Sequence, residues 1–298
     1  MKKYVIITDS ACDLEKSIRD KYDIKTVSMR YIYDGKDYEA DMDWNKISAP
    51  DFYDIIRNGT RITTSQVPQY EYEETFTKYI EEGYDILYVA CSSALSASVK
   101  SSYIVRDELL KKYPDAKIEC LDSLRACFAL GILAITAAEN RDAGMSLEEN
   151  VQWLNDHKLN VNMEGTVDSL IYLKRAGRVS AFSAFFGGIL GIKPIIIADA
   201  QGMNHAVEKV KGKKISFKRL VERVVERYED VPYQKVFISH ADCYEDALLL
   251  KEMLLAGLNK QIDVQIGYVG SCIGATVGPG MIGIYFFGKE VTVNKEQE

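Results

Sequence analysis

Short apolar runs alternate with amphipathic stretches through the first half of the chain. Buried strands are predicted for the apolar runs at residues 4–8, 85–90 and 117–121. Apolar residues at helical spacing, opened by small polar residues or Pro, predict helices over residues 13–22, 48–58, 69–82, 94–112 and 124–141. This alternation is typical of a parallel sheet with helices on both faces.

Two shorter features complete the first half. Residues 24–33 are expected to be extended, and Asp34-Gly35 predicts a tight turn into another extended piece at residues 37–40. Ser146-Leu147-Glu148-Glu149 fits a capping box, which predicts a helix that ends near residue 158. We place a domain boundary directly after this helix.

Strands and helices follow a different order in the second half. Helices are predicted at residues 170–176, after Ser180, at 216–228 and at 244–255. Strands are predicted at residues 194–198, 203–209, 235–239, 263–267 and 282–287, the first two as a hairpin around Gln201-Gly202. The chain is therefore predicted to form two α/β domains. Residues 1–159 form an N-terminal domain with a three-layer parallel sheet, and residues 160–298 form a C-terminal α/β domain with a mixed sheet.

Composition narrows the class of protein. The chain has 298 residues, of which 47% are hydrophobic, enough for a sizeable core in each domain. Acidic side chains outnumber Lys and Arg by 44 to 37, so we expect no broad nucleic-acid surface. No apolar stretch reaches the ~18 residues of a membrane span, which leaves at most a transient contact with a membrane surface. Six scattered Cys without a C-x-x-C pair, and no secretory signal, predict reduced thiols in a cytoplasmic protein.

Small hydroxyl and carboxylate residues gather after three predicted strands and between two predicted helices. Ligands of open α/β sheets bind outside the carboxyl ends of the strands, where backbone amides at helix starts also bind anions. Helix capping explains any single patch better, but four patches at one edge predict a shared site for a carboxylate or phosphate. These patches are Thr8-Asp9-Ser10, Thr63-Thr64-Ser65-Gln66, Ser92-Ser93-Ala94-Leu95-Ser96 and Asp122-Ser123.

Catalytic machinery is sparse in the sequence. His240 follows a predicted strand and is the one plausible catalytic histidine. An ester or phosphoester hydrolase with Ser96 or Ser93 as nucleophile and His240 as base is therefore the alternative function. Asp9 and Asp122 could meet around Mg²⁺ at the sheet edge, but a role in bracing loops is favoured. We expect no metal site and no cofactor.

An apolar segment rich in glycine spans residues 185–197. Glycine lets a backbone approach a ligand closely, and the Phe, Ile and Leu side chains beside it would line a tunnel for an acyl chain. An ordinary buried corner between a helix and a strand is the alternative interpretation. Arg175 and Arg178, just upstream, could face solvent, pair with acids or contact a partner. The acyl-chain residues that we predict are Phe186, Ile189, Leu190, Ile192 and Ile195.

Taken in order, these motifs resemble the DegV family of bacterial fatty-acid-binding proteins. The resemblance covers nearly the whole chain and also includes Leu173 through Arg178, residues 187–194 and Gly278-Pro279-Gly280. It implies two α/β domains with a long-chain fatty acid between them. It also implies a carrier rather than an enzyme, one that presents the fatty acid to a separate ATP-dependent kinase subunit, which forms an acyl phosphate.

The resemblance assigns roles to individual residues as well. It implies that hydroxyl groups of Thr64 and Ser96 hold the carboxylate, with Ser65 and Ser93 beside them. It also implies that the basic region of Arg178 contacts the kinase.

Two departures from the family pattern bear on function. Thr276 stands where members usually carry His, so it can offer only a neutral hydrogen bond to the head group. Ala94 and Ala97 replace glycines in the loop around Ser96, and their methyl groups crowd that loop. Both departures leave lipid binding in place and bear chiefly on the coupling to a kinase. A regulatory subunit with an empty pocket is the third class that we consider.

Overall fold

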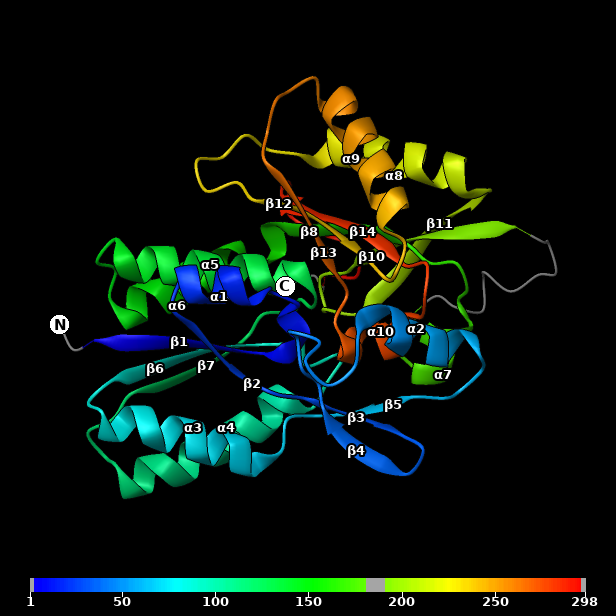
Figure 1. The fold of residues 1–298 in the computed structure, drawn as a ribbon. Helices are drawn as coiled ribbons and strands as arrows, with labels where there is room; N and C mark the ends of the chain where they lie inside the picture. Colours follow the sequence, from blue (N-terminus) through cyan, green and yellow to red (C-terminus); the bar gives the residue numbers. More distant parts are fainter. Residues whose placement is uncertain (1–2, 181–190, 296–298) are drawn as a thin grey trace.

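The first sheet of the protein is parallel and is covered by helices on both faces. The computed structural model describes residues 3–180 and 191–295. The strands β1 (Tyr4–Asp9), β2 (Ile24–Val27), β6 (Asp85–Ala90) and β7 (Ile118–Asp122) are ordered β2-β1-β6-β7. The helices above and below them are α1 (Lys16–Lys21), α5 (Phe128–Asp142) and α6 (Leu147–His157), and α3 (Gln69–Glu81) and α4 (Ser98–Lys112) (Figure 1). The predicted three-layer arrangement is confirmed.

The second sheet mixes parallel and antiparallel strands, as predicted. Its order is β13-β12-β14-β8-β10-β11-β9. Helices α8 (Lys213–Arg227) and α9 (Tyr244–Leu258) cover one face and share a hydrophobic core with it. Helix α5 packs on the other face, where the rings of Phe128 and Phe237 stack with centroids 4.8 Å apart. The strands are β8 (Val161–Thr166), β9 (Val179–Ser180), β10 (Ile192–Ala198), β11 (Asn204–Lys211), β12 (Val236–His240), β13 (Val264–Tyr268) and β14 (Ile282–Phe287).

A small antiparallel sheet and three short helices form a third unit beside the first two sheets. The strands β3 (Arg30–Tyr33), β4 (Lys36–Glu39) and β5 (Thr63–Ser65) are ordered β4-β3-β5. Helix α10 (Ser271–Val277), from near the end of the chain, packs against β3, β5, α2 (Ala49–Arg57) and α7 (Ile171–Ala176). Segments more than 200 residues apart in the sequence therefore meet here.

Several predicted elements differ from those in the structure. Residues 24–33, predicted as one extended piece, divide between β2 of the parallel sheet and β3 of the small sheet. The helix predicted from residue 94 begins at Ser98, because the backbone amides of Leu95 and Ser96 both turn back to the Ser92 carbonyl. The pattern of apolar residues did not predict β5, β8 or α10. Residues 181–190, predicted to be helical, lie outside the described residues.

We propose that the chain divides into two domains after residue 159. The strands of the first and third sheets precede this point, and those of the second sheet follow it. One buried core nevertheless includes residues of both halves, such as Ile6 and Leu87 with Phe237 and Tyr285. Within residues 3–180 and 191–295, no helix is both long and apolar enough to cross a bilayer.

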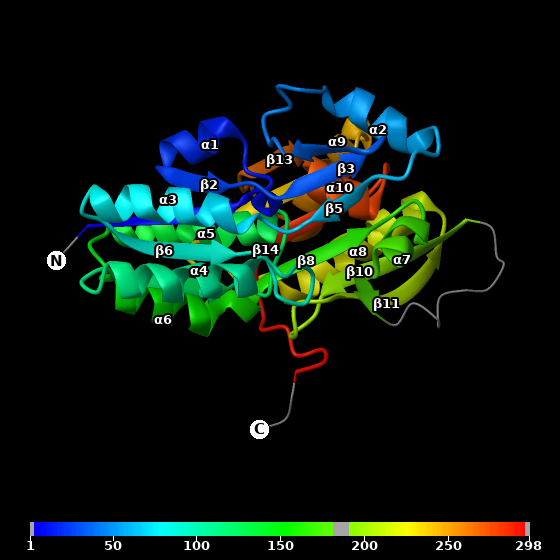
Figure 2. The ribbon, with the colours of Figure 1, turned by 90° about the horizontal axis from the view of Figure 1, so that it is seen from below.

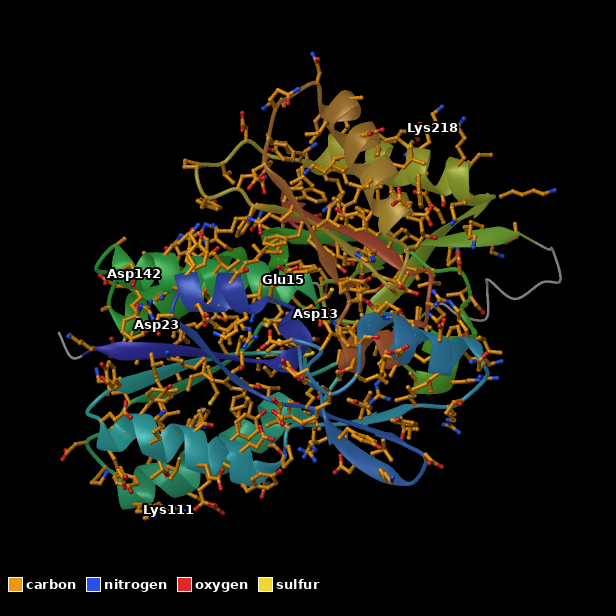
Figure 3. The ribbon with its side chains drawn as sticks, viewed as in Figure 1. Asp13, Glu15, Asp23, Lys111, Asp142 and Lys218 are labelled. Carbon is orange, nitrogen blue, oxygen red and sulfur yellow. The ribbon has the colours of Figure 1, made fainter. Side chains whose placement is uncertain are left out.

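Asp13 is a buried acid close to the centre of the molecule (Figure 3). Burial raises the pKa of its carboxyl group to about 7, and the nearby thiol of Cys127 and backbone amide of Gly270 offset only part of this rise. Among the residues that the structure describes, neither carboxylate oxygen has a partner with ordinary hydrogen-bond geometry. Because the folded state binds this proton more tightly than the unfolded chain, the contribution of Asp13 to stability falls as pH rises from about 4 to about 7.

Asp13→Asn is expected to remove this decline. Asn keeps the shape of the side chain and tolerates the left-handed backbone at this position, where φ is 54°. Relative to wild type, the variant should gain on the order of 1.4 kcal/mol of unfolding free energy per pH unit across that window. Urea unfolding at pH 5 and pH 8 measures the difference. Equal pH dependence in both proteins would contradict this assignment, and the exposed Asp115→Asn serves as the control.

Candidate functional site

A cavity of about 270 Å³ lies at the carboxyl end of the parallel sheet, against the second sheet. Its wall includes Cys91, directly after β6, and residues of β5 and α10 from the third unit. The second sheet contributes Met163, Ala198, Asn204 and Tyr285, from four different strands. The third unit lies on the side of the molecule away from the N-terminus (Figure 2). The cavity is thus assembled from all three sheets.

Four of the five predicted head-group residues line this cavity. They come from three separate segments: Thr64 and Ser65 lie on β5, Ser96 in the loop after β6, and Thr276 on α10. Thr64 is paired with Tyr31 of β3, which fixes its place on the small sheet. The sequence pattern suggested that these segments converge, and the structure brings them to one cavity.

Ser93 is the exception among the predicted head-group residues. Its backbone amide donates to Oδ1 of Asp122 at 3.1 Å, and the residue does not line the cavity. The same carboxylate oxygen accepts the backbone amide of Leu124 at 3.1 Å. Asp122 therefore connects the loops after β6 and β7, and the backbone of Ser93 forms part of this connection.

Asp9 holds the start of the loop that carries Ser96. The Asp9 carboxylate accepts the backbone amides of Cys91 at 2.8 Å and Ala11 at 3.0 Å, and the Tyr88 hydroxyl at 2.9 Å. Burial raises the pKa of Asp9 to about 6, and these three hydrogen bonds moderate the rise. Asp9 and Asp122 thus brace loops, as favoured from the sequence. Among the described residues, no group of three or more His, Cys, Asp and Glu side chains could hold a metal ion.

Ser92 connects the same loop to the second sheet. Its hydroxyl donates to the carbonyl of Gly202, in the β10–β11 hairpin, at 2.9 Å. Gly202 has φ of 83°, and a Cβ atom there would lie 2.2 Å from the Ser92 oxygen, so glycine is required. The Ser96 hydroxyl is 2.9 Å from that of Ser98 and accepts the Ser98 backbone amide at 3.2 Å. These contacts set the hydroxyl group of Ser96 at the cavity wall.

Neither of the two predicted acyl-chain residues that the structure describes, Ile192 and Ile195, lines the cavity. Ile195 points to the opposite face of the second sheet, where it is fully buried with Phe217 and Leu220 of α8. The prediction for Ile195 is corrected accordingly, because alternation along a strand sends neighbouring side chains to opposite faces. Ile192 is half-buried at the start of β10, away from the cavity wall. The remaining three, Phe186, Ile189 and Leu190, lie outside the described residues.

Sulfur-containing side chains supply much of the apolar wall instead. The cysteines were predicted to be reduced thiols and were not predicted at a ligand site. Burial raises the pKa of Cys272 and Cys91, so both stay protonated and behave as small apolar side chains. The sulfur of Cys272 lies 3.3 Å from that of Met29. In the described part of the wall these residues are Met29, Cys91, Cys127, Met163, Cys272 and Met281.

The two arginines singled out in the sequence lie at the mouth of the site: Arg178 is exposed where it lines the cavity, and Arg175 lines only the hollow beside it. Arg178 lines the cavity, and its Nε donates to the Leu95 carbonyl at 3.1 Å. Arg178 also lines an adjacent hollow of about 300 Å³, together with Arg175, Thr64 and Thr276. Arg125 also lines the described cavity and was not predicted as a site residue. Asp and Glu are absent from the described wall of the cavity, so its charge is positive.

His240 lies outside the cavity. It is buried at the end of β12, where its ring centroid is 4.2 Å from that of Tyr268 and its Nδ1 accepts the Cys243 backbone amide at 3.3 Å. Burial lowers the pKa of its imidazole to about 4. The described contacts of His240 include neither Ser96 nor Ser93, so the structure gives no support to the hydrolase alternative.

Comparisons with known proteins agree with this fold. The model of the DegV family matches residues 3–289. A DegV domain-containing protein of Clostridium perfringens is 39% identical over 288 residues, which are 97% of this chain and 98% of that protein.

Solved structures match over almost the whole chain. A DegV lipid-binding protein of Thermotoga maritima is 26% identical, with a TM-score of 0.83 over 97% of this chain and 100% of that one. DegV of Bacillus subtilis, a fatty-acid-binding protein, is 26% identical with a TM-score of 0.82 at the same coverage. The chain belongs to the DegV family.

Proposed function

We propose that the protein binds a long-chain fatty acid and presents it to a partner kinase. The carboxylate is held by the hydroxyl groups of Thr64 and Ser96, with Ser65 and Thr276 beside them. Residues 1–159 carry most of these groups, and residues 160–298 form most of the acyl-chain pocket. The protein acts as a carrier, and the kinase subunit forms the acyl phosphate.

The observation that carries this proposal is the convergence of hydroxyls on an apolar cavity with a positive mouth. Thr64, Ser96 and Thr276 come from distant segments and line one cavity, and Arg178 lies beside them. Hydroxyl donors and a cation suit a carboxylate, and thiol and thioether side chains suit an alkyl chain. Relatives with 26% identity over nearly the full length are lipid- or fatty-acid-binding proteins, which supports the same ligand class.

The proposed kinase contact rests on the arginines at the mouth. Arg175 is exposed on α7 and lines the hollow next to the cavity. A partner that approaches this hollow would meet Arg175 and Arg178 on its way to the carboxylate. Arginine suits contact with phosphate groups, because its planar group offers paired donors. Thr276 stands beside both, so the neutral head-group contact that replaces the family histidine faces the same opening.

Replacing both Thr64 and Ser96 by Ala is expected to weaken fatty-acid binding. Each lost hydrogen bond to a charged group costs about 1.5–3 kcal/mol, so the double variant should bind at least about 100-fold more weakly. Calorimetric titration with hexadecanoic acid measures the change. Ser17→Ala with Thr75→Ala, on α1 and α3 away from the cavity, is the matched control. An unchanged affinity in the site variant would refute the head-group assignment.

Arg175→Ala is expected to slow transfer to the kinase without changing fatty-acid affinity. An exposed charge contributes mainly to encounter with a partner, so the rate of acyl-phosphate formation should fall about fivefold. The assay follows ATP-dependent phosphorylation of the bound acid by the kinase subunit. Lys111→Ala, on the remote surface of α4 (Figure 3), is the control. If Arg175→Ala and Lys111→Ala supported equal rates, the kinase would not contact this surface.

A further inference from the structure

The hollow of about 300 Å³ beside the head-group cavity is rich in positive charge. Thr64, Arg178 and Thr276 line both spaces, so the hollow adjoins the place where the carboxylate is held. Asp and Glu are absent from the described wall of the hollow. The chain as a whole has a formal charge of −7, so this wall differs from the rest of the protein. Its arginines are Arg57, Arg61, Arg175 and Arg178.

Two separate segments hold these arginines around the hollow. Arg61 lies in the loop between α2 and β5, and the buried side chain of Ile62 anchors this loop in the core. Arg175 lies on the last turn of α7. Arg178 follows that helix, where its backbone amide donates to the Leu173 carbonyl at 3.2 Å. Helix α10 packs against α2, β5 and α7, so it holds both segments in place.

Most of this positive charge is not neutralised by acids. Arg57 pairs with Asp54 at 2.8 Å and with Asp242 at 2.6 Å, so its charge is compensated. Among the residues that the structure describes, the other three arginines of the hollow form no ion pair. Their side chains are exposed, so an anion that enters the hollow reaches them without displacing a protein carboxylate. The hollow therefore attracts anions.

Hydroxyl groups complete a set of donors that suits a phosphoryl group. Arginine binds phosphate oxygens through paired, planar donors, and hydroxyl groups add neutral hydrogen bonds. A fatty-acid carboxylate carries a single charge, and the hydroxyls of Thr64 and Ser96 already serve it on the cavity side. The uncompensated arginines exceed what that carboxylate requires, whereas a phosphoryl dianion would use them. The threonines that line the hollow are Thr60, Thr63, Thr64 and Thr276.

We propose that the hollow is a second anion subsite, which holds a phosphoryl group attached to the head of the bound acyl chain. The protein therefore binds an acyl phosphate more tightly than the fatty acid from which it forms. This inference rests on the proposed function and deepens it, because it names the phosphorylated product as the preferred ligand. Free inorganic phosphate shares the chemistry of the group, and the experiment below separates the two sources.

The chemistry of the head group explains the preference. When a carboxylate oxygen attacks the γ-phosphorus of ATP, a new P–O bond forms, the bond from that phosphorus to the bridging oxygen breaks, and ADP leaves. The head group then carries two negative charges instead of one. Its phosphorus lies one oxygen atom beyond the carboxyl carbon, and the hollow adjoins the cavity through Thr64 and Thr276. The added charge thus meets the uncompensated arginines.

The test compares two head groups on one acyl chain, by calorimetric titration of the intact protein. 2-Oxoheptadecylphosphonic acid keeps the hexadecanoyl chain and replaces the labile bridging oxygen of the acyl phosphate by a methylene group. It should bind about tenfold or more tightly than hexadecanoic acid, because the added group gains charge-assisted hydrogen bonds. This gain should shrink as the salt concentration rises, since the arginines are exposed.

Variants of Arg61 assign the gain to the hollow. Arg61→Ala should reduce the gain about threefold or more and leave the affinity for hexadecanoic acid unchanged, because Arg61 lines the hollow and not the cavity. Arg61→Lys should restore part of the gain, since it returns the charge without the planar donors. Lys111→Ala, which removes an exposed positive charge from the remote surface of α4, should keep the whole gain.

The outcomes separate this inference from the proposed function. Equal affinity for hexadecanoic acid and the phosphonate overturns the inference while fatty-acid binding stands, and so does a gain that Arg61→Ala leaves unchanged. Inorganic phosphate is also titrated into the protein loaded with hexadecanoic acid. Saturable binding that Arg61→Ala weakens, without any gain for the phosphonate, would assign the hollow to free phosphate and overturn the attached group. Failure of both long-chain ligands to bind would overturn the proposed function itself.

Discussion

The buried carboxylate of Asp9 is the interaction on which the rest of the site depends. It stands at the carboxyl end of the central strand β1 and accepts hydrogen bonds from Ala11, Cys91 and Tyr88. These bonds fix the start of the loop after β6, and that loop carries Ser92 to the second sheet and Ser96 to the cavity. An acid that is fully buried and multiply bonded defines one geometry for its neighbours, because any shift would leave an unpaired charge.

The cavity follows from how the sheets meet at this point. Ser92 bonds to Gly202 of the β10–β11 hairpin, and Arg125 bonds to the ends of β8 and β10. Helix α10 then brings Thr276 against β5 with Thr64. Backbone carbonyls thus hold the polar side chains in place, while thiol and thioether groups fill the space between them. This arrangement suits a ligand with a polar end and a long apolar part.

Elements that depend on local interactions could be predicted from the sequence, and those that depend on long-range contacts could not. Strands β1, β6 and β7 and helices α3 and α5 were predicted, because an apolar period of two or 3.6 residues is a local signal. The predicted starts of α4 and α5 were each four residues too early. Before α4, the backbone amides of Leu95 and Ser96 bond to the Ser92 carbonyl, in a loop held by Asp9. Strands β5 and β8 were missed, because short or polar strands are specified by their partners rather than by their own pattern.

In the candidate site, too, local sequence signals predicted some features and only long-range contacts decided the others. Hydroxyl residues at strand ends, and the resemblance to the DegV family, were enough to name Thr64, Ser65, Ser96 and Thr276. The sequence by itself thus determined the α/β class, the family and which hydroxyl residues are candidates for the head-group site. Only the tertiary structure decided that Ser93 braces a loop, that Ile195 faces the other core, and that a buried Arg125 stands in the wall. Burial and pairing depend on neighbours distant in the chain, and no local pattern records them.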